Sequence, residues 1–191
     1  MNRVISKRIF VAINLPDRAK DCLVGLQKQA QSLGFPIRAV DRSNLHLTLV
    51  FLGAVATEKI PVIVASVSEA VRGRPDFKIQ LGPTAVFNSF GKLSSWHVSL
   101  LNNALLAELF RDLTRKFLAQ RFNILTEHKF EPHITLGRFS PSASDRLNVA
   151  TLLELPVVPT SFMANSLDVM ESDLRFQPSR YYVIKAVPFS K

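Results

Sequence analysis

The spacing of hydrophobic residues changes several times along the chain, and these changes predict alternating strands and helices. Residues 8–15 form a short apolar run rich in β-branched side chains, which is typical of a buried strand. Residues 17–33 then carry apolar side chains at steps of three and four, which predicts an amphipathic helix ending at Gly34. The first half contains five such elements in the order strand, helix, strand, helix, strand, at residues 8–15, 17–33, 45–52, 58–72 and 76–87.

Local signals refine the second helix and the strand that follows it. Thr57 is a candidate N-cap, and Pro61 is tolerated in the first turn. The extended segment 76–87 is interrupted by Gly82 and Pro83. We expect the chain to cross from one half to the other around Asn88–Lys92.

The second half repeats the same order of elements. A strand, a helix, a strand, a short helix and two closing strands are predicted at residues 94–101, 103–119, 130–139, 142–154, 157–170 and 180–189. Ser142 and Asp145 have the spacing of a capping box at the start of the short helix. The repeat predicts an α+β, bilobal and pseudo-symmetric fold in one domain, 1–191, with halves of about 1–90 and 91–191.

Composition agrees with a folded protein and adds a strong positive charge. Hydrophobic residues make up 47% of the 191 residues and charged residues 20%, and the net charge is +9. Residues 1–93 hold 13 Lys and Arg against 6 Asp and Glu, whereas residues 94–191 hold 11 against 9. Such a charge favours polyanionic partners such as nucleic acid, although it also serves solubility alone.

Several classes of protein are disfavoured. Cys22 is the only cysteine, so an intrachain disulfide is impossible, and its place on the apolar face of a helix predicts a buried thiol. No apolar run approaches the roughly 18 residues of a membrane helix. The basic and apolar start lacks a signal-peptide cleavage site, so we expect a cytoplasmic protein. We also expect no membrane partner and a monomer.

One short pattern occurs twice, once in each half. His46 and Thr48 lie on one predicted strand, and His133 and Thr135 lie on another. Because side chains two apart on a strand point to the same face, each pattern presents an imidazole beside a hydroxyl. A single copy is most simply a structural histidine, but two copies in matching places favour a shared site in a central groove.

Two histidines and two threonines suit cleavage of a phosphodiester by in-line displacement. One base takes a proton from the nucleophile while one acid protonates the leaving oxygen, and histidine serves in either role near neutral pH. The threonine hydroxyls would donate hydrogen bonds to the non-bridging oxygens.

The other histidines and the usual cofactor motifs offer no competing site. His97 and His128 lack a threonine two residues later, and we interpret both as structural or surface residues. No metal-ligand spacing surrounds His46 or His133, so we expect no metal. A phosphate-binding Gly-rich loop is also missing, and we expect no cofactor.

Four segments of the sequence resemble a known family. The segments KRIFVAINLP, IRAVDRSNLHLTLVFLG, FEPHITLGRF and SLDVMESDLRFQPSRYYVIKAVPF are similar to blocks of the 2H phosphoesterase superfamily, and specifically of the bacterial and archaeal RNA 2′,3′-cyclic phosphodiesterases, once called 2′-5′ RNA ligases. The resemblance implies antiparallel sheets that face a central groove. It also implies metal-free hydrolysis of RNA 2′,3′-cyclic phosphate ends to 2′-phosphomonoesters.

The resemblance also assigns roles to individual residues. It implies that His46 and His133 are catalytic and that Thr48, Thr135 and Arg138 bind the phosphate. Strict alternation would turn Arg138 away from His133 unless Gly137 permits a bulge.

Three further positions bear on what lines the groove. Phe51, at the position equivalent to Arg138, is a candidate for base stacking or for core packing. Ala39 stands where the family often has Trp, and Gly137 where it often has Ala. The first of these departures would change the lining of the groove.

Two other functions compete with cyclic-end hydrolysis. A related enzyme could act as a 2′-5′ RNA ligase or on 2′-5′ oligonucleotides with the same four residues. An RNA-binding module without turnover would have no need of a matched acid and base, which disfavours it.

Overall fold

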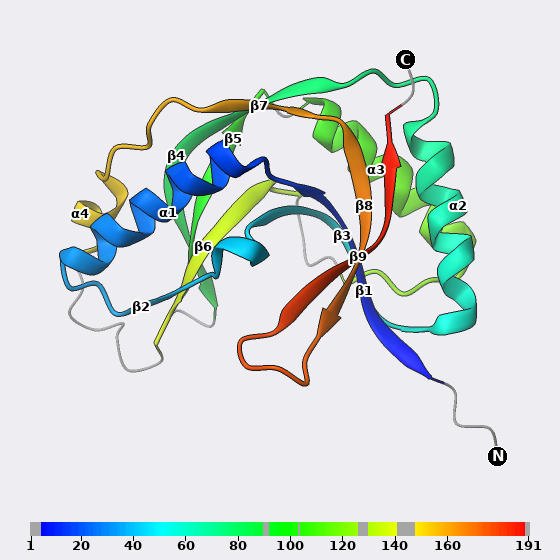
Figure 1. Ribbon diagram of the computed structural model, residues 1–191, viewed down its shortest axis with the longest axis horizontal. Coiled ribbons are helices and arrows are strands. Elements are labelled where there is room, and N and C mark those ends of the chain that lie inside the picture. The colour runs from blue at the N-terminus through cyan, green and yellow to red at the C-terminus, as the bar shows by residue number, and fades with distance from the viewer. Residues whose placement is uncertain (1–4, 90–91, 103, 126–129, 141–147, 190–191) are drawn as a thin grey trace.

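Two antiparallel sheets form the framework of the computed structural model, in which residues 5–89, 92–102, 104–125, 130–140 and 148–189 are described (Figure 1). One sheet has four strands in the order β3-β1-β8-β9, and the other has five in the order β2-β6-β5-β4-β7. The strands are β1 (Ser6–Asn14), β2 (Ile37–Ala39), β3 (His46–Ala56), β4 (Phe77–Ser89), β5 (Lys92–Leu101), β6 (His133–Phe139), β7 (Ser161–Ala164), β8 (Ser166–Asp173) and β9 (Arg180–Pro188).

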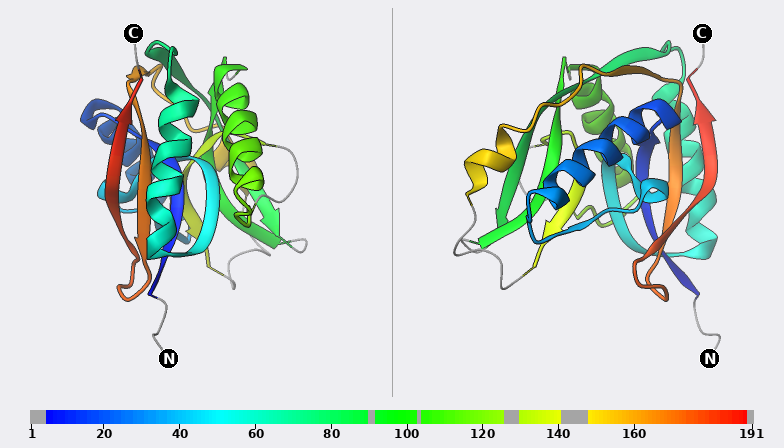
Figure 2. Two further views of the ribbon diagram at one scale, coloured as in Figure 1. Left: turned by 90° about the vertical axis from the view of Figure 1, so that its right-hand side faces the viewer. Right: turned by 60° about the vertical axis from the view of Figure 1, so that its left-hand side comes forward.

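The helices lie against the two sheets. They are α1 (Asp17–Ser32), α2 (Ile60–Val71), α3 (Ala104–Ala119) and α4 (Val149–Leu153). The first and last pack on the five-stranded sheet, while α2 and α3 run side by side on the four-stranded sheet (Figure 2). Within the described part of the chain, no helix is long and apolar enough to cross a membrane.

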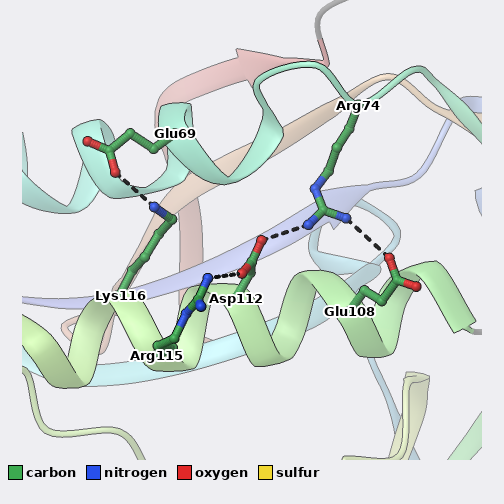
Figure 3. Close-up of polar contacts among 6 residues, drawn as sticks. All are labelled: Glu69, Arg74, Glu108, Asp112, Arg115 and Lys116. Carbon is green, nitrogen blue, oxygen red and sulfur yellow. Dashed lines mark hydrogen bonds and ion pairs between the residues drawn. The ribbon is translucent and has the colours of Figure 1, made fainter.

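Ion pairs join α2 and the segment directly after it to α3. The Arg74 guanidinium contacts the Asp112 carboxylate at 2.6 Å, and the Lys116 ammonium contacts Glu69 at 2.8 Å (Figure 3). Ion pairs that remain partly open to solvent, as these do, contribute little stability. The main contribution comes from apolar side chains such as Ile63 and Leu113, which are fully buried beneath them.

The predicted α+β fold with two antiparallel sheets is confirmed, but each sheet takes strands from both halves of the sequence. The four-stranded sheet pairs β1 and β3 with β8 and β9, and the five-stranded sheet combines β2 and β4 with β5, β6 and β7. The sequence halves are therefore interleaved in space, and whether they descend from an internal repeat remains a prediction.

Interleaving corrects the expected crossing at Asn88–Lys92. There β4 and β5 are neighbours in one sheet, with Asn88 opposite Leu93, so the chain makes a hairpin and stays in the same layer. The chain changes sheets after β1, β2 and β3, and for the last time near Asn165, where the single strand predicted over 157–170 divides into β7 and β8 of different sheets.

Smaller differences concern caps and Cys22. No side-chain hydrogen bond from Thr57 caps α2, which follows a 3₁₀ turn at Thr57–Lys59. Ser142 and Asp145 lie outside the described residues, and α4 begins at Val149. Cys22 is only partly buried, and its Sγ lies 3.3 Å from the Thr160 hydroxyl.

Candidate active site

The two His-x-Thr patterns lie on different sheets and line one cavity of about 610 Å³. His46 and Thr48 come from β3 at the edge of the four-stranded sheet. His133 and Thr135 come from β6 in the five-stranded sheet, and β3 packs against β6. The groove therefore has one imidazole and one hydroxyl on each wall, as the sequence predicts.

A bulge in β3 adds Phe51 to the wall that carries His46. Thr48 lies opposite Ala12 of β1, and Phe51 lies opposite Phe10, with Leu49 as the extra residue between the two registers. Since Ala12 and Phe10 share one face of β1, Thr48 and Phe51 share a face as well, although they are three residues apart. Phe51 stacks on Phe10 with ring centroids 5.4 Å apart, so it packs against a neighbour and also lines the groove.

The second sheet contains a matching bulge in β6, which brings Arg138 into the groove. Thr135 lies opposite His97 of β5 and Arg138 opposite Ser95, and Leu136 is the extra residue between them. The bulge that Arg138 requires is therefore present, one residue before Gly137. Arg138 lines the same cavity as His133.

The peptide carbonyl of Leu136 shows how this bulge is held. The buried side chain of Gln27 on α1 donates to it at 2.7 Å, and the Val40 amide donates at 2.8 Å. A carbonyl displaced from a sheet ladder must find other donors when buried, and here α1 and the end of β2 provide them.

Each imidazole is anchored to the backbone in the same way. Nδ1 of His46 lies 2.6 Å from the Asn44 carbonyl, and Nδ1 of His133 lies 2.8 Å from the Glu131 carbonyl. A carbonyl oxygen only accepts, so Nδ1 carries the proton in both rings. Nε2 is consequently the nitrogen that gains and loses a proton.

The surroundings of His46 are aromatic. Its ring lies 5.1 Å from Phe10 and 5.1 Å from Tyr181, and Nε2 lies 2.9 Å from the Thr48 hydroxyl. Burial lowers the pKa of His46 below its ordinary value, the Asn44 carbonyl opposes that shift, and the charge of His133 adds to it. A charge on His133 therefore disfavours a charge on His46.

His133 packs against a second aromatic group. Its ring lies 4.8 Å from Phe87 and 5.0 Å from His97. Burial lowers its pKa, the Glu131 carbonyl and carboxylate raise it, and Arg138 lowers it. In the free protein both imidazoles therefore favour the neutral form more than an exposed histidine does.

A comparison with known protein families agrees with this site. Residues 24–175, which contain both His-x-Thr patterns, match the profile of the 2′-5′ RNA ligase superfamily. The chain belongs to this superfamily of 2H phosphoesterases. It is accordingly an enzyme of the phosphoesterase class.

Two curated relatives with the same name are similar to this chain over most of its length. A Thermotoga maritima protein named RNA 2′,3′-cyclic phosphodiesterase is 30% identical over 131 residues, which cover 69% of this chain and 69% of the relative. One of the same name from Thermus thermophilus is 31% identical over 157 residues, 78% of this chain and 77% of the relative.

Solved structures confirm the fold. TT0787 of Thermus thermophilus superposes with a TM-score of 0.79 at 24% identity, over 95% of this chain and 97% of that chain. Escherichia coli LigT, complexed with 3′-AMP, superposes with a TM-score of 0.77 at 22% identity, over 98% and 100%.

Within this 2H phosphoesterase, sequence reasoning missed the aromatic residues that surround the histidines. Tyr181 and Phe87 line the cavity, yet they come from strands that are distant in sequence from either motif. The polar and apolar alternation of β9 and β4 predicts strands, but nothing local shows which groove they line.

The two remaining histidines are His97, which is buried behind His133, and His128. His97 is structural, since it is only 4% exposed and stacks on Phe87 at 4.1 Å, and burial lowers its pKa to about 4. His128 lies outside the described residues. Among the residues that are described, no group of three His, Cys, Asp or Glu side chains has the arrangement of a metal site.

Proposed function

We propose that this protein hydrolyses 2′,3′-cyclic phosphate ends of RNA to 2′-phosphomonoesters by two-histidine acid and base catalysis without a metal. The observation that carries the proposal is the pair of imidazoles on opposite walls of one groove, each with Nδ1 held by a carbonyl two residues earlier. The shared name of the curated relatives supports the choice of substrate.

The anchored rings supply both proton transfers. With Nδ1 protonated, a neutral ring offers the lone pair of Nε2 to a water molecule, and a charged ring offers the Nε2 proton to a leaving oxygen. In-line displacement puts these two oxygens on opposite sides of phosphorus, which matches a histidine on each wall. We assign His133 as the base for water and His46 as the acid that protonates O3′.

Three side chains would hold the phosphate. Thr48 donates to Nε2 of His46 when that ring is neutral. When His46 is charged, Nε2 becomes a donor and the Thr48 hydroxyl is released toward a phosphate oxygen. Thr135 and Arg138 line the opposite wall and would stabilise the charge that develops on the non-bridging oxygens.

The decisive experiment uses a short RNA with a 2′,3′-cyclic end, incubated with the protein and EDTA. We expect complete conversion to the 2′-phosphate, identified by chromatography against both isomers, at the same rate with and without chelator. A 3′-phosphate product would contradict the assignment of O3′ as the leaving oxygen. Loss of turnover with EDTA, restored by one divalent ion, would contradict metal-free catalysis.

The same incubation distinguishes the competing activities. Adding an RNA with a free 5′-hydroxyl tests the reverse joining reaction, and a 2′-5′-linked oligonucleotide tests internal hydrolysis. We propose that cyclic-end hydrolysis is faster than either. The cytoplasmic location and the monomeric state remain predictions from the sequence.

A further inference from the structure

A second cavity of about 820 Å³ adjoins the active-site groove. The two cavities share five lining residues, including Phe51, Arg138 and Tyr181. Beyond these, the second cavity extends along β2 and the segment that connects β8 to β9, so its floor is formed by both sheets.

This second cavity is much more basic than the groove that holds the histidines. Arg8, Arg38 and Arg138 all line it, whereas Arg138 is the only Lys or Arg among the lining residues of the first. Arg38 and Arg138 lie directly opposite each other on β2 and β6, and both are exposed. Among the described residues, none of the three arginines forms an ion pair.

Nearby acidic groups do not cancel this charge. Asp173 is paired with Arg175 at 2.7 Å and Glu171 with Lys7 at 2.7 Å. Asp41 is the one carboxylate among the lining residues of the second cavity. The cavity therefore presents three guanidinium groups and one carboxylate to an anion.

Aromatic side chains accompany the arginines. The Arg8 guanidinium lies 5.1 Å from the centre of the Phe51 ring. Phe176 is contacted by Arg180, which is not among the lining residues of the cavity, at 4.0 Å from the ring centre. Phe176 and Leu174, which is 56% exposed, add apolar surface to the second cavity. Guanidinium groups beside aromatic rings are what single-stranded RNA requires, since the former contact phosphates and the latter stack with bases.

We propose that this cavity, lined by Arg8, Arg38 and Phe176, binds the RNA segment immediately 5′ of the cyclic end. The inference rests on the proposed function, because it takes the terminal phosphate to lie between the two histidines. The chain 5′ of that phosphate must then leave the groove, and the arginine-rich side offers it a path. The enzyme would thus prefer an oligonucleotide to a mononucleotide.

The test compares a nucleoside 2′,3′-cyclic monophosphate with a trinucleotide that has the same terminal base and a cyclic end. For wild type we expect kcat/KM to be about tenfold higher for the trinucleotide, since a hydrogen bond to a charged group contributes about that factor or more. The double variant Arg8→Gln with Arg38→Gln should reduce this ratio to near one. The control Arg72→Gln with Arg115→Gln removes the same charge at exposed sites, one directly after α2 and one on α3, and should keep the wild-type ratio.

Each outcome separates this inference from the proposed function. Equal kcat/KM for the two substrates in wild type would overturn the second subsite while leaving the hydrolase intact. An equal fall in the ratio in the control variant would show a general effect of charge and would also overturn it. If neither substrate is hydrolysed, fluorescence anisotropy with a labelled trinucleotide 2′-phosphate tests the cavity directly. The proposal then requires that the double variant at Arg8 and Arg38 binds the trinucleotide more weakly than wild type, while the control variant binds it as wild type does.

Discussion

The two catalytic candidates are anchored to the backbone in the same way, each through a carbonyl two residues earlier, but their surroundings differ. His46 lies among Phe10, Tyr181 and Thr48, whereas His133 lies against Phe87 and His97. Identical anchoring fixes the same nitrogen toward the groove in both rings. Because their neighbours differ, the two histidines can have different pKa values, which allows one to act as the acid and the other as the base.

Replacing either imidazole should stop proton transfer without unfolding the protein. We expect His46→Ala and His133→Ala each to lower kcat by about 10²–10⁴-fold, the usual contribution of a positioned acid or base. Thr48→Ala and Thr135→Ala should have smaller effects, because each removes one hydrogen bond. Steady-state kinetics with a melting curve for each variant provides the measurement. A variant with wild-type kcat and an unchanged Tm would show that its histidine takes no part in catalysis.

The lowered pKa of both histidines predicts a specific pH dependence. The acid must be protonated, and in the free enzyme its pKa lies below the ordinary value of about 6.5. The alkaline fall of kcat/KM should therefore begin on the acid side of pH 6.5. A bound phosphate anion favours the charged ring, so the alkaline fall of kcat should lie at higher pH.

A nucleoside cyclic monophosphate is the suitable substrate for these profiles, because its diester does not titrate in this range. Both profiles should be bell-shaped, with apparent values that belong to the coupled pair. An alkaline limb in kcat/KM well above pH 7, or none at all, would contradict the assignment.

At the scale of elements, hydrophobic spacing predicts the strands and long helices but not the details of register. The alternation around His46 and His133 places each motif on a strand correctly. It cannot show that Leu49 and Leu136 are bulged, because a bulge depends on the register of the partner strand. The sequence alone therefore cannot show that Phe51 and Arg138 lie on the faces of their strands that line the groove. The sequence does not predict the short β2 either, because its three residues contain too little periodicity.

A substitution at Gly137 tests how closely β2 must pack against β6. A Cβ there would clash with the Ile37 side chain and lie 3.0 Å from the Arg38 carbonyl, so β2 would have to move away from β6. We expect Gly137→Ala to destabilise the protein by about 1–3 kcal/mol, as overpacking does. Urea unfolding provides the measurement.

Two further variants make that result specific. Gly25 of α1 has no atom within 4 Å of its added Cβ, so Gly25→Ala should be neutral or stabilising by about 0.5–1 kcal/mol. Adding Ile37→Ala to Gly137→Ala should recover part of the loss. If Gly137→Ala were as stable as wild type, the close approach of β2 would not be required.

At the scale of the whole molecule, the net charge of +9 should appear as a salt effect on oligonucleotide substrates. For single strands, each phosphate contacted adds about 0.7 to the slope of log K against log salt. We expect log kcat/KM for an oligonucleotide to fall with salt more steeply than for a mononucleotide. Parallel titrations with sodium chloride measure both slopes, and a salt-independent rate for the oligonucleotide would show that the charge lies away from the bound RNA.

The interleaving of the two sequence halves has a consequence for how the protein is made. β1 pairs with β3 within the first 56 residues, but its other neighbour, β8, begins only at Ser166. At about 5–20 residues per second, roughly 5–20 s of synthesis separate the end of β3 from the start of β8. During that time the unpaired edge of β1 is open to other chains, and the wall that carries His46 is incomplete. A ribosome-bound chain that stops before β8 should therefore be inactive and need a chaperone, although both of its His-x-Thr motifs are already synthesised.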